Sequence, residues 1–187
     1  MGKLTYLAIT SLDGYVTDRN GDFSWAEPDE EVHAFANALA ERIGTELYGR
    51  KMYEVMHVWQ TLGDEPDQPE VVRDYAEAWK ARDKVVYSST LESVWTPRTE
   101  LRRTFDAAEV RRIVAASDLD VSVSGPTLAA TAIRAGLIDE YQLILNPVAV
   151  GGGGVGAFPD DNDVRLDLVE ERRFASGVVY LRYRNRT

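Results

Sequence analysis

Four short stretches of this chain, each rich in glycine, basic residues or hydroxyl residues, lie at the points where strands are predicted to end. They are residues 49–51 (GRK), 88–90 (SST), 123–126 (VSGP) and 151–154 (GGGG). The first and third also start helical patterns, and the N–H groups and dipole at a helix start attract negative charge. Two cations at such a start are unfavourable unless an anion faces them, which favours an anion-binding role for residues 49–51. These stretches predict a site for a phosphate-bearing ligand.

Two of these stretches also have simpler interpretations. The hydroxyls of residues 88–90 could satisfy only the turn backbone, although they are suitable phosphate donors if several strand ends line one cleft. The glycine run at 151–154 permits close backbone approach to a ligand, and a flexible surface loop explains it equally well.

Two acids occupy positions where a carboxyl group could face a ligand. Asp13 precedes Gly14 at the end of a β-prone run. Such a pair usually marks a turn, and this is the favoured interpretation, although the bend could also bring the Asp13 carboxylate to a ligand. Glu30 belongs to three acids that complement the dipole of a helix start, and it lies near the apolar face, where it could face a pocket. Partial burial would raise the pKa of either carboxyl group toward a value useful for proton transfer.

Residues 119–146 predict the element that positions the VSGP turn. Valines alternate with serines over 121–124, Pro126 suits the first helical position, and Gly136 suits the residue after the helix end. Residues 141–145 supply a second strand. A crossover this short joins parallel strands and places the helix start at the carboxyl edge of a sheet, where α/β proteins bind ligands.

The rest of the chain alternates between predicted strands and helices. Strands are predicted at 3–11, 45–49, 84–87 and 100–105, and helices at 28–43 (with Gly44 as the stop), 50–58, 72–79 and after a capping box at 106–109. Residues 164–174 and 178–183 predict an antiparallel hairpin. We therefore expect one α/β domain over residues 1–187, with a mixed, mainly parallel sheet covered by helices on both faces.

Composition restricts the function further. The chain has no cysteine, which excludes a disulfide framework and thiolate catalysis, and with only two histidines it disfavours a zinc site. The net charge of −10 disfavours nucleic acid and anionic membranes as partners. Neither a signal peptide nor an apolar stretch of membrane-spanning length is recognisable, so we expect a soluble, cytoplasmic protein.

The order of these motifs resembles the dihydrofolate reductase superfamily. It is most similar to the reductase domain of riboflavin biosynthesis (the RibD C-terminal domain) and its stand-alone bacterial relatives. The motifs are SLDGYVT (11–17), LYGRKMYE (47–54), VVYSSTL (85–91), SGPTLAATAIRAGLIDEY (124–141) and NPVAVGGG (146–153). None is specific alone, but the five occur in the right order and cover essentially the whole chain. The resemblance implies a three-layer dihydrofolate reductase-like fold.

The resemblance also implies that NADPH binds along the carboxyl edges of the strands. By this match the cofactor-binding positions are Gly49, Arg50, Lys51, Ser88, Ser89, Ser124, Gly125, Pro126, Thr127 and Leu128. The first five would hold the 2′-phosphate and adenosine side, and the rest the pyrophosphate. The substrate would lie beside Gly14, Trp25, Gly151, Gly152 and Gly153, with Glu30 and Asp13 as the catalytic candidates, Glu30 slightly ahead.

Three positions depart from the riboflavin reductases. Val123 stands where they usually carry an acid, and Leu7 and Tyr15 stand where they often carry lysine. These changes remove groups that would contact a phosphoribosyl-aminopyrimidine. Trp25, Pro28 and Glu30 reproduce the W-x-x-P-x-[DE] helix entry of dihydrofolate reductases, although the other motifs are closer to the riboflavin branch.

The expected function is therefore NADPH-dependent hydride transfer to a C=N or C=O carbon of a small pterin- or aminopyrimidine-like substrate. The enzyme would resemble 5-amino-6-(5-phosphoribosylamino)uracil reductase. The alternatives are a non-catalytic nucleotide- or pterin-binding protein and a true dihydrofolate reductase. Because relatives commonly pair, a homodimer is a further expectation, with the C-terminal hairpin as its interface.

Overall fold

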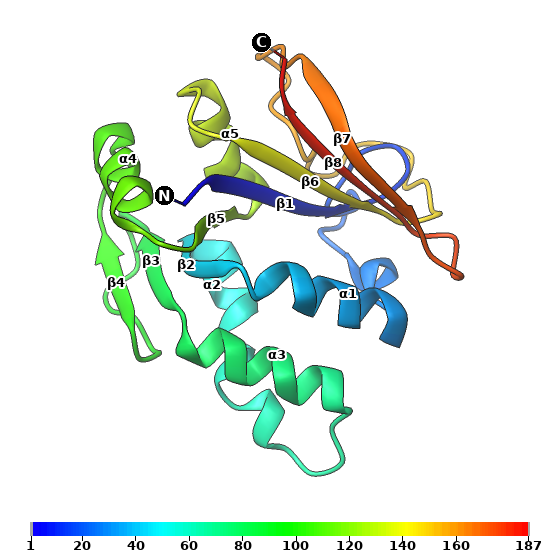
Figure 1. Ribbon diagram of the computed structural model, residues 1–187, viewed down its shortest axis with the longest axis horizontal. Coiled ribbons are helices and arrows are strands. Elements are labelled where there is room, and N and C mark those ends of the chain that lie inside the picture. Colours follow the sequence, from blue (N-terminus) through cyan, green and yellow to red (C-terminus); the bar gives the residue numbers. More distant parts are fainter. Residues whose placement is uncertain (1, 187) are drawn as a thin grey trace.

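The computed structural model describes residues 2–186, which form one eight-stranded sheet with helices on both faces (Figure 1). The strands are β1 (Leu4–Thr10), β2 (Ile43–Gly49), β3 (Asp83–Tyr87), β4 (Thr99–Arg102), β5 (Asp120–Ser124), β6 (Glu140–Leu145), β7 (Leu166–Arg173) and β8 (Val179–Asn185). The α-helices are α1 (Glu30–Ala40), α2 (Arg50–Met56), α3 (Glu70–Ala81), α4 (Ala107–Ala116) and α5 (Pro126–Arg134). Short 3₁₀ helices occupy Ser24–Ala26, His57–Gln60 and Leu62–Asp64.

The strand order is β4-β3-β2-β5-β1-β6-β8-β7. The first six strands in this order are parallel, whereas β8 runs antiparallel to β6 and β7 antiparallel to β8. The predicted mixed, mainly parallel sheet with a C-terminal hairpin is confirmed. Because β1 lies between β5 and β6, the unit of residues 119–146 crosses over one strand instead of joining neighbours.

Each face of the sheet has its own apolar core. On one face, Tyr6 and Val123 belong to a buried cluster that includes residues of α4 and α5. On the other, Tyr48 and Trp79 pack with residues of α2, while Phe35 of α1 packs against the hairpin. Figure 1 shows the same division, with α1 and α3 below the sheet and α4 and α5 above it. Since side chains alternate along a strand, Ser122 and Ser124 of β5 point to the α1–α3 side, opposite Val123.

One helix boundary and one helix cap differ from the sequence prediction. Helix α1 ends at Ala40, because Ile43 and Gly44 belong to β2 and Ile43 pairs with Asp120. The prediction that Gly44 stops the helix is therefore wrong. The capping box at residues 106–109 is only half formed: the Asp106 carboxylate accepts from the Ala108 amide at 2.9 Å, but the Glu109 carboxylate accepts from Arg102 Nε at 2.8 Å.

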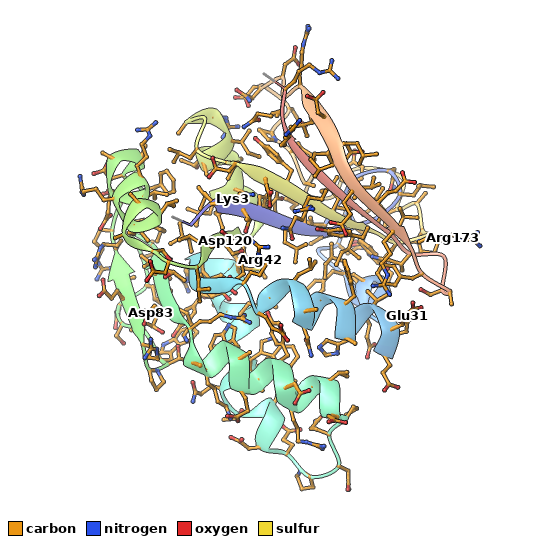
Figure 2. All side chains as sticks on the ribbon, in the orientation of Figure 1. Lys3, Glu31, Arg42, Asp83, Asp120 and Arg173 are labelled. Carbon is orange, nitrogen blue, oxygen red and sulfur yellow. The ribbon has the colours of Figure 1, made fainter. Side chains whose placement is uncertain are left out.

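The amino edge of the sheet is held by ion pairs within the protein. Figure 2 shows Lys3, Arg42 and Asp120 close together at this edge, far from Glu31 and Arg173 beside the hairpin. The Asp120 carboxylate accepts from the Lys3 amide at 2.9 Å and lies 3.5 Å from Arg42 Nε. A hollow of about 560 Å³ also lies at this edge. It is lined by none of the predicted site residues, and its Arg98 is paired with Asp83 at 2.8 Å. The predicted site residues lie at the opposite edge, where the parallel strands end.

Candidate functional site

The predicted site residues gather where the parallel strands end. Asp13 and Gly14 follow β1, Gly49 ends β2, Ser88 and Ser89 follow β3, Ser124 ends β5, and the glycine run follows β6. Since β3, β2, β5, β1 and β6 are consecutive neighbours and parallel, these turns lie along one edge of the sheet. This edge holds segments that are more than 100 residues apart in the chain.

The turn before α5 is shaped for close backbone approach. Gly125 has φ 90°, a conformation that favours glycine, and a Cβ built on it would lie 3.0 Å from Cβ of Met52 on α2, a tight contact. No side chain caps α5, and Pro126 is its first residue. The first amide groups of a helix have no intrahelical partner, so those of Thr127 and Leu128 suit an anion. The Leu128 side chain is buried in the core, so Leu128 would contact a ligand through its backbone amide.

The start of α2 presents two exposed cations beside the turn after β3. Gly49 is the N-cap residue, and Arg50 and Lys51 follow it. Arg50 Nε donates to Glu54 Oε1 at 2.6 Å, and Nη1 donates to Thr90 Oγ1 at 2.9 Å. The guanidinium group thus joins α2 to the SST turn.

The two serines of the SST turn have different environments. Ser88 is buried, and its hydroxyl accepts from the Leu91 amide at 2.9 Å and the Thr90 amide at 3.3 Å. The simpler interpretation of a turn-forming hydroxyl therefore holds for Ser88, because the turn buries it. Ser89 is exposed and can meet a ligand.

A hollow of about 340 Å³ adjoins this turn and Arg50. Its lining residues are Arg50, Thr90, Leu91, Glu92, Ser93 and Trp95. The indole of Trp95 is 50% exposed and stacks on the Tyr53 ring, with 5.2 Å between centroids. Arg103 stabilises the loop of residues 88–91 by donating to the carbonyl groups of Ser88 and Leu91. Neither Trp95 nor Arg103 is among the site residues predicted from the sequence, and a tryptophan in a polar loop is the one available signal for them.

The carboxylate of Asp13 ties the SLDG turn to the glycine run. It accepts from the Ser11 hydroxyl at 2.7 Å, the Val150 amide at 3.1 Å and the Gly151 amide at 2.9 Å. These hydrogen bonds, led by that of Ser11, hold the pKa of the Asp13 carboxyl below its usual value. The expectation that burial raises this pKa is wrong, because the group is exposed and bonded in its charged form. Asp13 is suited to anchoring a loop rather than to donating a proton.

The glycines beside Asp13 are required for two different reasons. Gly14 has φ 86°, and Gly151, Gly152 and Gly153 have φ between 77° and 82°. Gly154 is required by space, since a Cβ there would lie 1.8 Å from the Thr17 carbonyl oxygen. The run is therefore a strip packed against the SLDG loop, with Tyr15 beside Gly152.

Glu30 and Trp25 lie at the entrance of α1. Asp29 is the cap, since its carboxylate accepts from the Val32 amide at 2.8 Å. The Glu31 carboxylate faces the hairpin, accepting from the Ala175 amide at 3.2 Å. Glu30 is exposed rather than partly buried, so of the three acids it is the one left for a ligand. The Trp25 indole is half-buried, and within residues 2–186 its Nε1 has no hydrogen-bond partner.

Neither a metal cluster nor a membrane-spanning helix occurs in the described chain. Residues 2–186 contain no group of three or more His, Cys, Asp or Glu side chains placed to hold a metal ion. Across the same residues, no helix is both long and apolar enough to cross a bilayer.

Comparison with known proteins gives a consistent set of relatives. The family model of the RibD C-terminal domain matches residues 2–180. The Bacillus subtilis (strain 168) protein YyaP, described as uncharacterized, is 30% identical over 183 residues, which cover 95% of this chain and 91% of YyaP.

Solved structures share the fold. A putative riboflavin biosynthesis protein from Shewanella sp. PV-4 superimposes with a TM-score of 0.74 at 20% identity, covering 99% of both chains. A pyrimidine reductase-like protein from Corynebacterium diphtheriae gives 0.69 at 14% identity, covering all of this chain and 92% of that one. The Thermotoga maritima diaminohydroxyphosphoribosylaminopyrimidine deaminase/5-amino-6-(5-phosphoribosylamino)uracil reductase gives 0.63 at 14% identity, covering 99% of this chain and 57% of that one. The predicted dihydrofolate reductase-like, RibD-type fold is thereby confirmed.

Proposed function

The chain belongs to the RibD C-terminal domain family, to which the reductase of riboflavin biosynthesis belongs, and on that premise we propose that it is an NADPH-dependent reductase. Its substrate would be a small pterin- or aminopyrimidine-like heterocycle that accepts hydride at a C=N or C=O carbon. The observation that carries the proposal is the single sheet edge on which the α5 start, the Arg50 hollow and the Asp13-anchored glycine strip lie together.

The residues present fit a dinucleotide phosphate. The Gly125 turn has the positive φ that glycine allows and no side chain in front of the helix start, and the amides of Thr127 and Leu128 would hold the pyrophosphate without a basic surface. Gly49, Lys51, Ser89 and the Arg50 guanidinium group would hold the 2′-phosphate side, while the half-exposed Trp95 ring offers a stacking face for adenine. When bound, the nicotinamide supplies the hydride.

The protein would align the substrate and manage one proton. Gly14 and the strip Gly151–Gly153 would lie beside the reacting rings, and the exposed Glu30 at the α1 entrance would polarise or protonate the substrate. Asp13 would act through the strip that it anchors. If Glu30 has this role, Glu30→Gln lowers turnover and leaves NADPH affinity unchanged.

A second candidate is a nucleotide- or pterin-binding protein without catalysis. The observation that favours it is that Val123, at the position of the family's acid, is fully buried in the core below the cleft. The substrate-contacting lysines are also replaced, by the half-buried Leu7 and Tyr15. Hence the phosphoribosyl-aminopyrimidine itself is not our favoured substrate.

Calorimetric titration with NADPH and NADH tests the cofactor first. Arg50→Ala should weaken NADPH at least tenfold, since one charge-assisted hydrogen bond contributes about 1.5–3 kcal/mol, and should leave NADH unchanged. Arg111→Ala, at an exposed position on α4, controls for the loss of one positive charge. NADPH oxidation is then followed with a panel of pterins and aminopyrimidines. Binding without turnover supports the second candidate, and absence of NADPH binding overturns both.

A further inference from the structure

Arg50, which is predicted to bind the 2′-phosphate, is already paired with an acid of its own helix. Arg50 Nε lies 2.6 Å from Glu54 Oε1, one helical turn away on α2. The side chains of Arg50 and Glu54 are 47% and 37% exposed, so the pair lies at the surface and not within the core, and Arg50 also lines the hollow. A ligand phosphate that reaches this guanidinium group meets a carboxylate in direct contact with it.

A second acid adds to the negative charge around the hollow. Glu92 lines the hollow together with Arg50. The carboxylates of Glu54 and Glu92 therefore offset the positive charges of Arg50 and Lys51. Like charges within a few ångströms repel each other strongly when water is partly excluded. A phosphate group carries up to two negative charges, so nearby carboxylates repel it about twice as strongly as they repel a single negative charge.

The 2′-phosphate is the group by which NADPH differs from NADH, so an acid beside its binding cation affects the choice between them. We propose that Glu54 is a specificity-determining residue that competes with the 2′-phosphate for Arg50 and keeps the preference for NADPH over NADH small. This inference rests on the proposed function. It differs from the simpler role of Glu54 as an ordinary i, i+4 partner that stabilises α2, since that role predicts no effect on nucleotide choice.

Glu54→Gln separates the two roles, because it removes the charge and retains an oxygen that can accept from Arg50 Nε. Affinities are measured by calorimetry for NADPH and NADH, and for adenosine 2′,5′-bisphosphate and adenosine 5′-monophosphate, which differ only in the 2′-phosphate. We expect Glu54→Gln to raise both affinity ratios roughly 1.5-fold to fivefold, the range of an exposed charge interaction. The gain should shrink as salt rises from 0.05 to about 0.5 M, because screening weakens exposed charges.

Glu171→Gln is the matched control, since it removes one negative charge from an exposed position on β7, far from the hollow along the sheet. Glu54→Asp retains the charge and should keep the wild-type ratio. A ratio that is unchanged in Glu54→Gln, or raised equally in Glu171→Gln, overturns the inference while leaving the reductase intact. A fall in the ratio also overturns it, since Glu54 would then position Arg50 for phosphate. If the wild-type protein binds none of the four nucleotides, the proposed function fails as well.

Discussion

At the scale of single residues, hydrogen bonding separates the two acids that sequence alone treats as equals. The Asp13 carboxylate is bonded to the Ser11 hydroxyl and the Val150 and Gly151 amides, which stabilise its charged form. Glu30 is exposed at the first turn of α1, and the helix is capped by the neighbouring Asp29 instead of by Glu30. The proton-handling role that we propose is therefore assigned to Glu30, and a structural role to Asp13.

The anchoring role of Asp13 predicts a local change in Asp13→Asn. Asparagine has only one side-chain oxygen, so it cannot replace both carboxylate oxygens as acceptors for the two amides. Hydrogen exchange at the Val150 and Gly151 amides should therefore accelerate roughly fivefold to tenfold, the effect of losing one net hydrogen bond.

The effect of Asp13→Asn should also depend on pH. Because the pKa of Asp13 is lower in the folded state than in the unfolded state, its carboxylate stabilises the fold above the unfolded pKa of about 3.9. This stability is lost as the pH falls through the lower folded pKa. The variant and wild type should converge there. Asp163→Asn, in an exposed loop, is the control, and equal acceleration in both variants would contradict the prediction.

At the scale of elements, the turns after the strands carry the candidate site, and glycine is required in them for different reasons. In the strip after β6, three consecutive glycines have positive φ, whereas Gly154 gives room for the Thr17 carbonyl. The SLDG loop and the strip are further joined by hydrogen bonds from the Leu12 amide to the Val148 carbonyl and from the Val16 amide to the Val155 carbonyl. They form one structural unit beside β1 and β6.

This difference predicts a ranking of two alanine variants. Gly151→Ala meets no atom within 4 Å and costs only backbone strain, about 1–2 kcal/mol. Gly154→Ala forces the backbone at Thr17 to move, which costs about 1–3 kcal/mol or more and should break the contact of the Val155 amide with Thr17 Oγ1. Urea unfolding gives the ranking, and hydrogen exchange at Val155 locates the change. Equal costs, or a larger cost for Gly151→Ala, would contradict the packing argument.

At the scale of the whole molecule, the hairpin leaves β7 as an edge strand of the sheet. Leu168 and Val169 on β7 are 49% and 43% exposed, and an edge with exposed apolar side chains favours pairing with another chain. The homodimer expected from the resemblance remains a proposal, with this edge as its interface (Figure 1).

Light scattering after size exclusion tests the pairing. Wild-type protein should elute with the mass of two chains, and Leu168→Glu should shift it to one chain without lowering NADPH affinity, since the cleft lies at the ends of other strands. Leu119→Glu, at another half-exposed leucine away from the hairpin, should remain dimeric. A monomeric wild-type protein, or dissociation in both variants, would reject the β7 interface.

Residues 119–146 show how much could be predicted from the sequence. Val-Ser alternation, Pro126 at the helix start and Gly136 at φ 61° after its end are local signals, and they predicted β5, α5 and β6 within a few residues. The anion-ready turns and the α/β class follow from the same local chemistry, because periodicity and turn preference depend on neighbours in the chain.

Only the tertiary structure decided which strand lies beside which, and which polar groups are already used. The insertion of β1 between β5 and β6, the bonding of Asp13 to amides 137 and 138 residues away, the burial of Ser88 and the exposure of Trp95 all depend on distant contacts. Helix and turn signals act over a few residues, whereas strand pairing and hydrogen-bond satisfaction are settled when distant segments meet. The sequence therefore determined where the chemistry-bearing turns occur, and the fold determined which of their side chains remain free to meet a ligand.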